Sequence, residues 1–156
     1  MFLTIHSAAG AVIGNSVQNP ILAFILGFAS HFVLDRIPHI DPNLDISTKK
    51  SFQFTKPVIL MGAIALIDTT LVILLAFVLI KKFHLEPINT ISGMFGSILP
   101  DYLMGLSVLL KNKYLSAFDR FHRFCHFDEK KILVPWYAGS AIQIILLVSS
   151  VYLLLS

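Results

Sequence analysis

The stretch 57-PVILMGAIALIDTTLVILLAFVLI-80 decides the fold class of this chain. Its 24 residues contain a single charged side chain, Asp68, and lysines bound the stretch at Lys56, Lys81 and Lys82. A helix of this length rises roughly 36 Å, which exceeds the hydrocarbon core of a bilayer at about 30 Å. The stretch therefore predicts a helix that spans a membrane.

The composition of the whole chain agrees with this prediction. Of the 156 residues, 56% are hydrophobic and 13% are charged, whereas about 25% of the residues in a soluble domain are charged. The formal net charge of +3 is carried by short connecting segments, which is typical of membrane orientation rather than nucleic-acid binding. We expect one membrane-embedded domain, 1–156, with no nucleic-acid partner.

Further helices are predicted on both sides of the central span. The stretches 88–110 and 132–155 are long enough to form two more spans. The first 36 residues favour two helices, 2–14 and 20–36, because the polar segment 15–19 has turn chemistry, with one continuous span as the alternative. The predicted fold is therefore an all-α, polytopic membrane protein with an N-terminal helical hairpin plus three transmembrane helices.

The basic residues predict an orientation for these helices. The segments 36–56 and 111–131 contain ten of the twelve lysines and arginines, and Lys81 and Lys82 are the other two. Because lysine and arginine concentrate in cytoplasmic loops, both segments are expected in the cytoplasm.

A group of ionisable residues lies at the end of the second predicted helix, in 27-GFASHFVLDRIPHID-41. His31 and Asp35 are four residues apart and share a helix face. Pro38 disfavours helix just before it, so His39 is expected to fold back from a turn. Ionisable groups near a membrane are costly unless they are paired or bound to metal, so their clustering indicates a functional site that opens toward the cytoplasm.

Small and polar residues recur at every fourth position on three of the predicted helices. Residues at this spacing share a face and let membrane helices approach closely. If the three faces meet, His6, His31, Asp35 and Asp101 enter one pocket, and glycine-mediated packing alone is the alternative. The three series are His6, Gly10 and Gly14; Ala23, Gly27, His31 and Asp35; and Gly93, Ser97, Asp101 and Gly105.

Two further positions each allow two interpretations. His122 and His126 have the spacing of a two-histidine metal site. The phenylalanines and arginines around them equally describe an amphipathic helix at the membrane interface, within 111–131. Asp68, in the middle of the first span, is either a ligand, base or orienting residue, or a protonated acid that bonds to a neighbouring helix.

Several short motifs together resemble a known family. The chain resembles the small bacterial inner-membrane proteins known as membrane-bound metal-dependent hydrolases, and its Ser-His-x-x-x-Asp element is similar to the histidine–aspartate motif of zinc-dependent phospholipases C. The resemblance implies an integral protein of the bacterial inner (plasma) membrane. The motifs are His6-Ser-Ala-Ala-Gly10, Ser30-His31-Phe-Val-Leu-Asp35, Pro38-His39, Leu99-Pro100-Asp101 and His122-Arg123.

The function expected from these residues is metal-assisted hydrolysis of a membrane-associated ester or phosphoester. The expected cofactor is a divalent metal, with zinc suggested by the family resemblance. The expected ligands are His6, His31, Asp35 and Asp101, completed by His39, His122 or His126. Asp68 or Asp41 would act as base or orienting residue, and Arg120 and Arg123 would hold a phosphate.

Two other classes of function fit the same composition. One is a small transporter or ion-conducting protein, in which the histidines and carboxylates relay protons or metal and four or so segments would require a homo-oligomer. The other is a non-catalytic scaffold that binds membrane lipids or a partner through 111–131. Membrane lipids are expected partners in every case.

Overall fold

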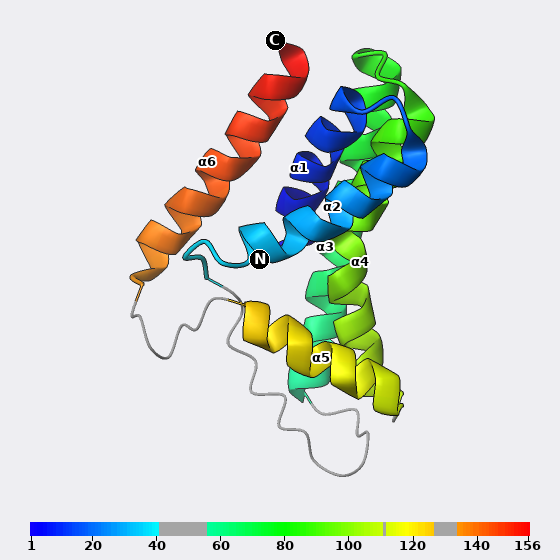
Figure 1. The fold of residues 1–156 in the computed structure, drawn as a ribbon. Helices are drawn as coiled ribbons and strands as arrows, with labels where there is room; N and C mark the ends of the chain where they lie inside the picture. The colour runs from blue at the N-terminus through cyan, green and yellow to red at the C-terminus, as the bar shows by residue number, and fades with distance from the viewer. Residues whose placement is uncertain (41–55, 111, 127–133) are drawn as a thin grey trace.

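The computed structural model describes residues 1–40, 56–110, 112–126 and 134–156, and every regular element within these ranges is an α-helix, as predicted. The helices pack as a bundle with a shorter helix across one end (Figure 1). They are α1 (Leu3–Ser16), α2 (Pro20–Leu34), α3 (Lys56–Lys82), α4 (Pro87–Leu109), α5 (Lys113–Cys125) and α6 (Trp136–Leu155).

The N-terminal hairpin forms as two helices rather than as one continuous span. Asn19 caps the start of α2, because its side chain accepts a hydrogen bond from the Leu22 amide at 3.0 Å, and Pro20 occupies the first helical position. At the other end α2 stops at Leu34, two residues earlier than predicted, and Asp35 is its C-cap. This early end frees the chain to turn before Pro38.

Among the described residues, two helices are long and apolar enough to cross a membrane, α3 over 58–82 and α6. In the most apolar 18-residue stretch of each helix, only 17% of the residues are buried inside the protein, so most of the apolar side chains face outward. The third predicted span, 88–110, does form α4, but it does not meet the same criterion. It is less apolar because glycines and polar residues occupy the face that packs against α1 and α2.

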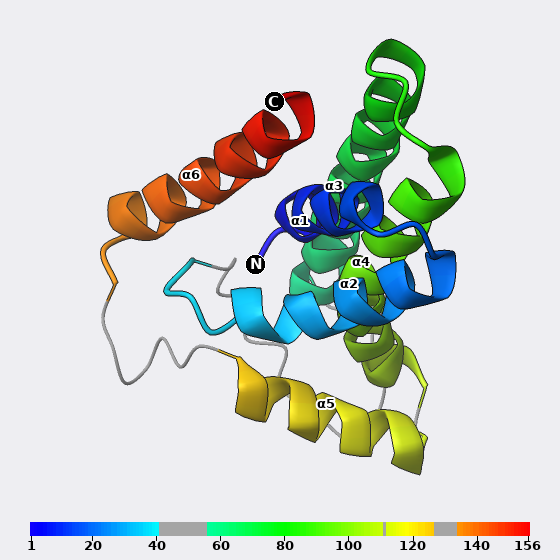
Figure 2. The same ribbon diagram turned by 45° about the horizontal axis from the view of Figure 1, so that its top comes forward.

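Close glycine contacts bring α1 and α2 onto α4. A Cβ atom added at Gly10 of α1 would lie 2.4 Å from the Gly93 carbonyl oxygen, and one added at Gly27 of α2 would lie 2.3 Å from the same atom. Real Cβ atoms do not approach backbone this closely, so these positions require glycine. Figure 2 shows α1 in the middle of the bundle, with α2, α3, α4 and α6 around it.

The amphipathic helix α5 lies across the foot of the bundle and contacts α4 (Figure 1). Its inner face carries Phe118, whose ring centroid lies 6.4 Å from those of Phe28 and Phe32 on α2. Its outer face leaves Tyr114 72% exposed and Phe124 76% exposed. One face of α5 therefore packs on the bundle, and the other presents aromatic rings outward.

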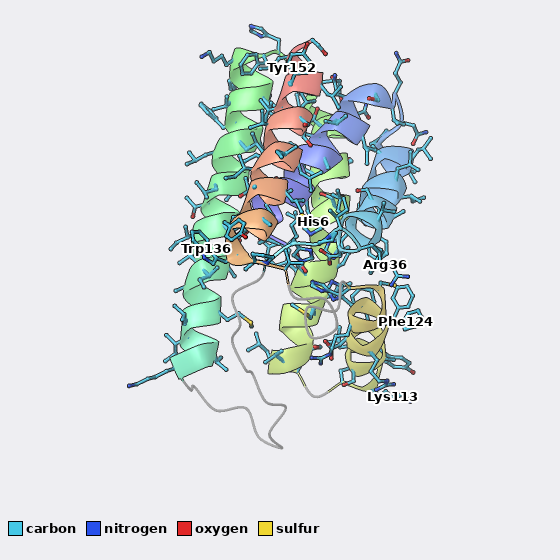
Figure 3. The ribbon with its side chains drawn as sticks, turned by 90° about the vertical axis from the view of Figure 1, so that its left-hand side faces the viewer. His6, Arg36, Lys113, Phe124, Trp136 and Tyr152 are labelled. Atoms are coloured by element: carbon cyan, nitrogen blue, oxygen red, sulfur yellow. The ribbon has the colours of Figure 1, made fainter. Side chains whose placement is uncertain are left out.

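His6 lies part-way along the bundle rather than at either end. Figure 3 shows Tyr152 at one end and Lys113 at the other, with His6 and Trp136 near one level between them. Along the long axis of the bundle, His6 therefore lies near Trp136, the first residue of α6, rather than near the middle of that helix.

Candidate metal centre

Ionisable side chains from four helices converge where α2 ends. His6 comes from α1, His31 from α2, Asp101 from α4 and His122 from α5, and Asp35 is the C-cap of α2. His6 and His31 are 0% exposed, Asp35 is 1% exposed and His122 is 2% exposed. The sequence prediction that the three small-residue faces meet around His6, His31, Asp35 and Asp101 is confirmed in this arrangement.

His31, Asp35, Asp101 and His122 form a group that could hold a metal ion, with one ligand atom from each and all four atoms within 4.8 Å of one another. His31 Nε2 lies 3.1 Å from Asp35 Oδ2, 2.9 Å from His122 Nε2 and 3.8 Å from Asp101 Oδ1. His122 Nε2 lies 3.4 Å from Asp35 Oδ2 and 3.5 Å from Asp101 Oδ1. Ligands about 2.0–2.2 Å from a tetrahedral metal lie roughly 3.3–3.6 Å apart, so this spacing suits one small cation.

The orientation of His31 favours metal binding. Its Nδ1 lies 2.8 Å from the backbone carbonyl oxygen of Ser97 on α4, which can only accept, so Nδ1 carries the proton and donates. Nε2 is then left with its lone pair, and it faces the two carboxylates. A ligating histidine whose other nitrogen donates to a carbonyl is a recurring feature of metal sites, because the second bond fixes both the tautomer and the ring.

Asp35, His39 and His126 form a second group that meets the same spacing criterion. His126 Nε2 lies 3.8 Å from Asp35 Oδ2, and the rings of His39 and His126 are 4.8 Å apart. His39 is fully buried, and its Nδ1 donates to the Ile37 carbonyl at 2.7 Å, which again leaves Nε2 as the nitrogen with a lone pair. Asp35 belongs to both groups, and the same oxygen, Oδ2, is the one that faces His31, His122 and His126.

Helix α6 holds the segment that carries His39. The Gln143 side chain donates from Nε2 to the Ile40 carbonyl at 2.8 Å, and a Cβ atom at Gly139 would lie 2.7 Å from Ile40 Cγ1. The turn after α2 is thereby packed against a helix distant in sequence, which explains how His39 becomes buried.

His6 contacts the cluster through Asp35. Its Nε2 lies 3.1 Å from Asp35 Oδ1 and 4.0 Å from Asp101 Oδ2, and its ring stacks on that of His31 with centroids 4.1 Å apart. The amino group of Met1 lies 3.4 Å from the same Asp35 oxygen. His6 is outside both ligand groups, so this geometry suits a residue that orients Asp35.

The two carboxylates place a positive charge on a histidine of α5. Burial opposes the charged form of His122, but the hydrogen bonds that His122 donates to Asp101 and Asp35 outweigh burial and raise the pKa of His122 to about 9. The carboxylates therefore favour a positive charge at this position. A divalent ion that binds here would take the place of that proton.

Asp68 lies elsewhere, at the start of α1. Helix α1 has no side-chain cap of its own, and Asp68 of α3 accepts hydrogen bonds from the Leu3 amide at 2.5 Å, from the Thr4 amide at 3.0 Å and from the Thr4 hydroxyl. A carboxylate that caps a helix N-terminus satisfies otherwise unpaired N–H groups and interacts favourably with the helix dipole. This role explains an acid in the middle of an apolar helix without assigning it to the cluster.

We therefore predict that Asp68→Ala destabilises the protein and leaves metal content unchanged. The expected loss is about 2 kcal/mol, at the upper end for a lost helix cap, because three donors lose their acceptor. Thermal unfolding in detergent measures the stability, and elemental analysis of the same samples measures the metal. Unchanged stability together with lost metal would instead place Asp68 in the site.

The remaining predicted site residues lie beside the cluster or outside the described residues. Arg123 donates to Asp119 one turn earlier on α5, and Arg120 is exposed. Their role in holding a phosphate therefore stays a prediction. Asp41 lies outside the described residues.

The Ser97 carbonyl and the Gln143 amide position the cluster but were not predicted from the sequence. A backbone acceptor leaves no mark in the residue order, and Gln143 lies more than 100 positions from the segment that it holds. No protein-family model, curated protein or solved structure matches the chain.

Proposed function

We propose that this cluster binds a divalent metal and that the protein is a membrane-embedded hydrolase of an ester or phosphoester. The observation that carries the proposal is the convergence of His31, Asp35, Asp101 and His122 at the spacing of metal ligands. Two imidazoles and two carboxylates form a ligand set that suits zinc, and the family resemblance points to the same ion.

The residues of the cluster would have different roles in the proposed hydrolysis. A divalent cation in this site would polarise the scissile group and lower the pKa of a bound water. Asp101 and His126 are the most accessible members, with side chains 16% and 22% exposed, so substrate would approach along them. A carboxylate oxygen of Asp101 that is not used as a ligand would accept the proton from the attacking water.

The helices suggest the substrate class and the location. With α3 and α6 across the bilayer, Trp136 would mark the boundary between lipid and water, and the cluster near its level would face the ester or phosphate region of a lipid. Lys56 at the start of α3 and Lys113 on α5 would lie in the cytoplasm, with Lys81 and Lys82 on the far side. We propose the bacterial inner membrane as the location.

The test is turnover by the purified protein in lipid nanodiscs after loading with Zn²⁺. We expect release of water-soluble headgroups or fatty acids from bilayer lipids, measured by mass spectrometry. We also expect His122→Ala to lower the rate by at least about 100-fold, the cost of removing one main electrostatic contributor in an active site. Asp119→Asn, a buried acid of α5 outside both ligand groups, is the matched control and should keep the activity.

Metal-loaded protein that hydrolyses none of the lipid esters and phosphoesters supplied would contradict the hydrolase assignment. In that case, movement of Zn²⁺ or protons across proteoliposomes made with the same protein would favour the transporter instead.

A further inference from the structure

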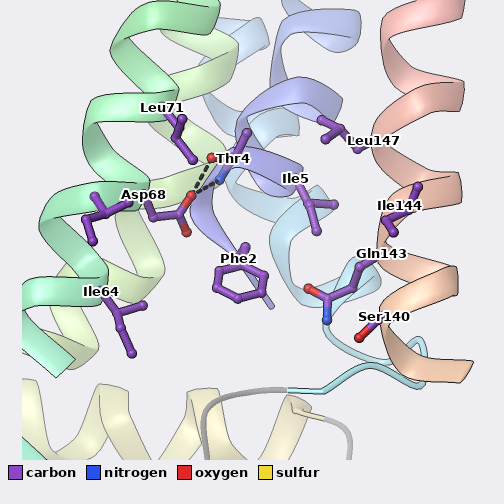
Figure 4. Close-up of a pocket in the computed structure, with 11 residues that line it drawn as sticks. Phe2, Thr4, Ile5, Ile64, Asp68, Leu71, Ser140, Gln143, Ile144 and Leu147 are labelled. Atoms are coloured by element: carbon purple, nitrogen blue, oxygen red, sulfur yellow. Dashed lines mark hydrogen bonds between the residues drawn. The ribbon is translucent and has the colours of Figure 1, made fainter. Parts of the chain in front are cut away.

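A second feature of the molecule is a cavity of about 490 Å³ between the start of α1, the middle of α3 and the first half of α6 (Figure 4). It lies on the side of α1 that carries Ile5. Its volume falls within the range of small-molecule sites, roughly 300–1,000 Å³. The lining residues are Phe2, Thr4, Ile5, Ile64, Ile67, Asp68, Leu71, Ser140, Gln143, Ile144 and Leu147.

The walls of this cavity are the two helices that can cross a membrane. Ile64, Ile67 and Leu71 line it from α3, and Ile144 and Leu147 line it from α6. These α6 positions lie eight and eleven residues after Trp136, about 12 and 16 Å along the helix axis. With Trp136 at the membrane boundary, the cavity would lie at the depth of lipid acyl chains and its occupant would be apolar.

The cavity also has a polar corner with an unsatisfied acceptor. Gln143 is 4% exposed, and its Oε1 has no hydrogen-bond partner among the described residues. The Gln143 amide can be oriented in only one way. One of its two terminal atoms bonds to the Ile40 carbonyl oxygen, and because a carbonyl oxygen only accepts, that atom must be the nitrogen. Figure 4 shows the Gln143 oxygen directed from α6 toward Phe2 on the opposite side. A buried acceptor without a partner is destabilising, so a donor from an occupant would stabilise this corner.

We infer that this cavity binds one acyl chain of a membrane lipid, and that a hydroxyl or amide next to the chain donates to Gln143 Oε1. The cavity uses the oxygen of Gln143, whereas the nitrogen holds the segment that carries His39, and the inference does not depend on the proposed hydrolysis.

Photolabelling in nanodiscs tests the chain-binding part of this inference. A phosphatidylcholine with a diazirine on its acyl chain should label peptides that contain Ile5 and Leu147. Leu71→Trp fills the cavity and should abolish this labelling. The matched control is Leu74→Trp, one turn further along α3, where leucine is 54% exposed and does not line the cavity.

Equal labelling of Leu71→Trp and Leu74→Trp would overturn the site. Parent protein treated with a metal chelator should label like untreated parent, which separates this result from the metal proposal.

A second pair of probes tests the role of Gln143. A diacylglycerol with the same diazirine chain carries a free hydroxyl, whereas phosphatidylcholine has no such donor near its chains. The parent should label more with the diacylglycerol, and Gln143→Leu should lose this preference while phosphatidylcholine labelling persists. Equal labelling of the parent by both probes would overturn the assigned hydrogen bond.

Discussion

Asp35→Asn is expected to release metal from both ligand groups at once, because Asp35 is the one residue that the groups share. Its carboxylate contacts His31 and His122 at 3.1 and 3.4 Å in one group and His126 at 3.8 Å in the other. The amide keeps the shape of the side chain but removes the negative charge that a divalent ion requires. Changes to residues that only orient ligands cost roughly 10–100-fold in metal affinity, so we expect a loss above about 100-fold here.

Equilibrium dialysis against buffered Zn²⁺ measures this loss, and size-exclusion elution and circular dichroism show whether the variant still folds. Asp119→Asn is the control, since Asp119 is also a buried acid but pairs with Arg123. His39→Ala removes a ligand of the second group only and should retain the ion bound through His31. An Asp35→Asn protein that folds and binds Zn²⁺ like the parent would contradict the assignment of Asp35 as a ligand.

Gly93→Ala is expected to cause a large loss of stability in the bundle. A Cβ atom at Gly93 would lie 2.1 Å from the Gly10 carbonyl oxygen and 2.9 Å from the Gly14 amide nitrogen. Both neighbours are backbone atoms of α1, so the whole helix would have to move. Overpacking a core costs about 1–3 kcal/mol and occasionally more, and we expect at least the upper value here.

Gly105→Ala is the matched control on the same helix, because none of the described residues lies within 4 Å of a Cβ atom placed there. It should be neutral or should stabilise α4 by up to about 1 kcal/mol, the difference in helix propensity between alanine and glycine. Thermal unfolding of both variants in one detergent gives the comparison. Equal unfolding temperatures would show that α1 and α4 do not pack through Gly93.

The helices of the fold could be predicted from the sequence to within a few residues. The turn at 15–19 and the apolar run at 57–80 have local causes, namely turn-forming residues and continuous hydrophobicity. The prediction that 88–110 forms a third span is not supported by the composition of α4. One face of α4 carries glycines and polar residues that pack against neighbouring helices, and such a helix need not be as apolar as one that faces lipid on all sides.

The candidate site was predictable where its members follow helical periodicity. Spacing by four residues brought His31 and Asp35 to one face, and the small residues on each helix predicted that His6 and Asp101 would join them. For Asp68, bonding to a neighbouring helix was one of the two predicted alternatives, but the cap on α1 was not predictable, because it depends on a contact between residues 65 positions apart. The burial of His39 likewise depends on α6, which packs against the residue that follows it.

The most direct test of this account is the metal content of the parent protein. The protein should be purified with a tag that contains no histidine, dialysed without chelator and analysed by mass spectrometry of the elements. We predict a stoichiometric divalent metal, with zinc as the main element, that His31→Ala and His122→Ala each remove. Parent protein that holds no stoichiometric metal, and that fails to bind Zn²⁺ when it is supplied, would contradict the metal centre and the function built on it.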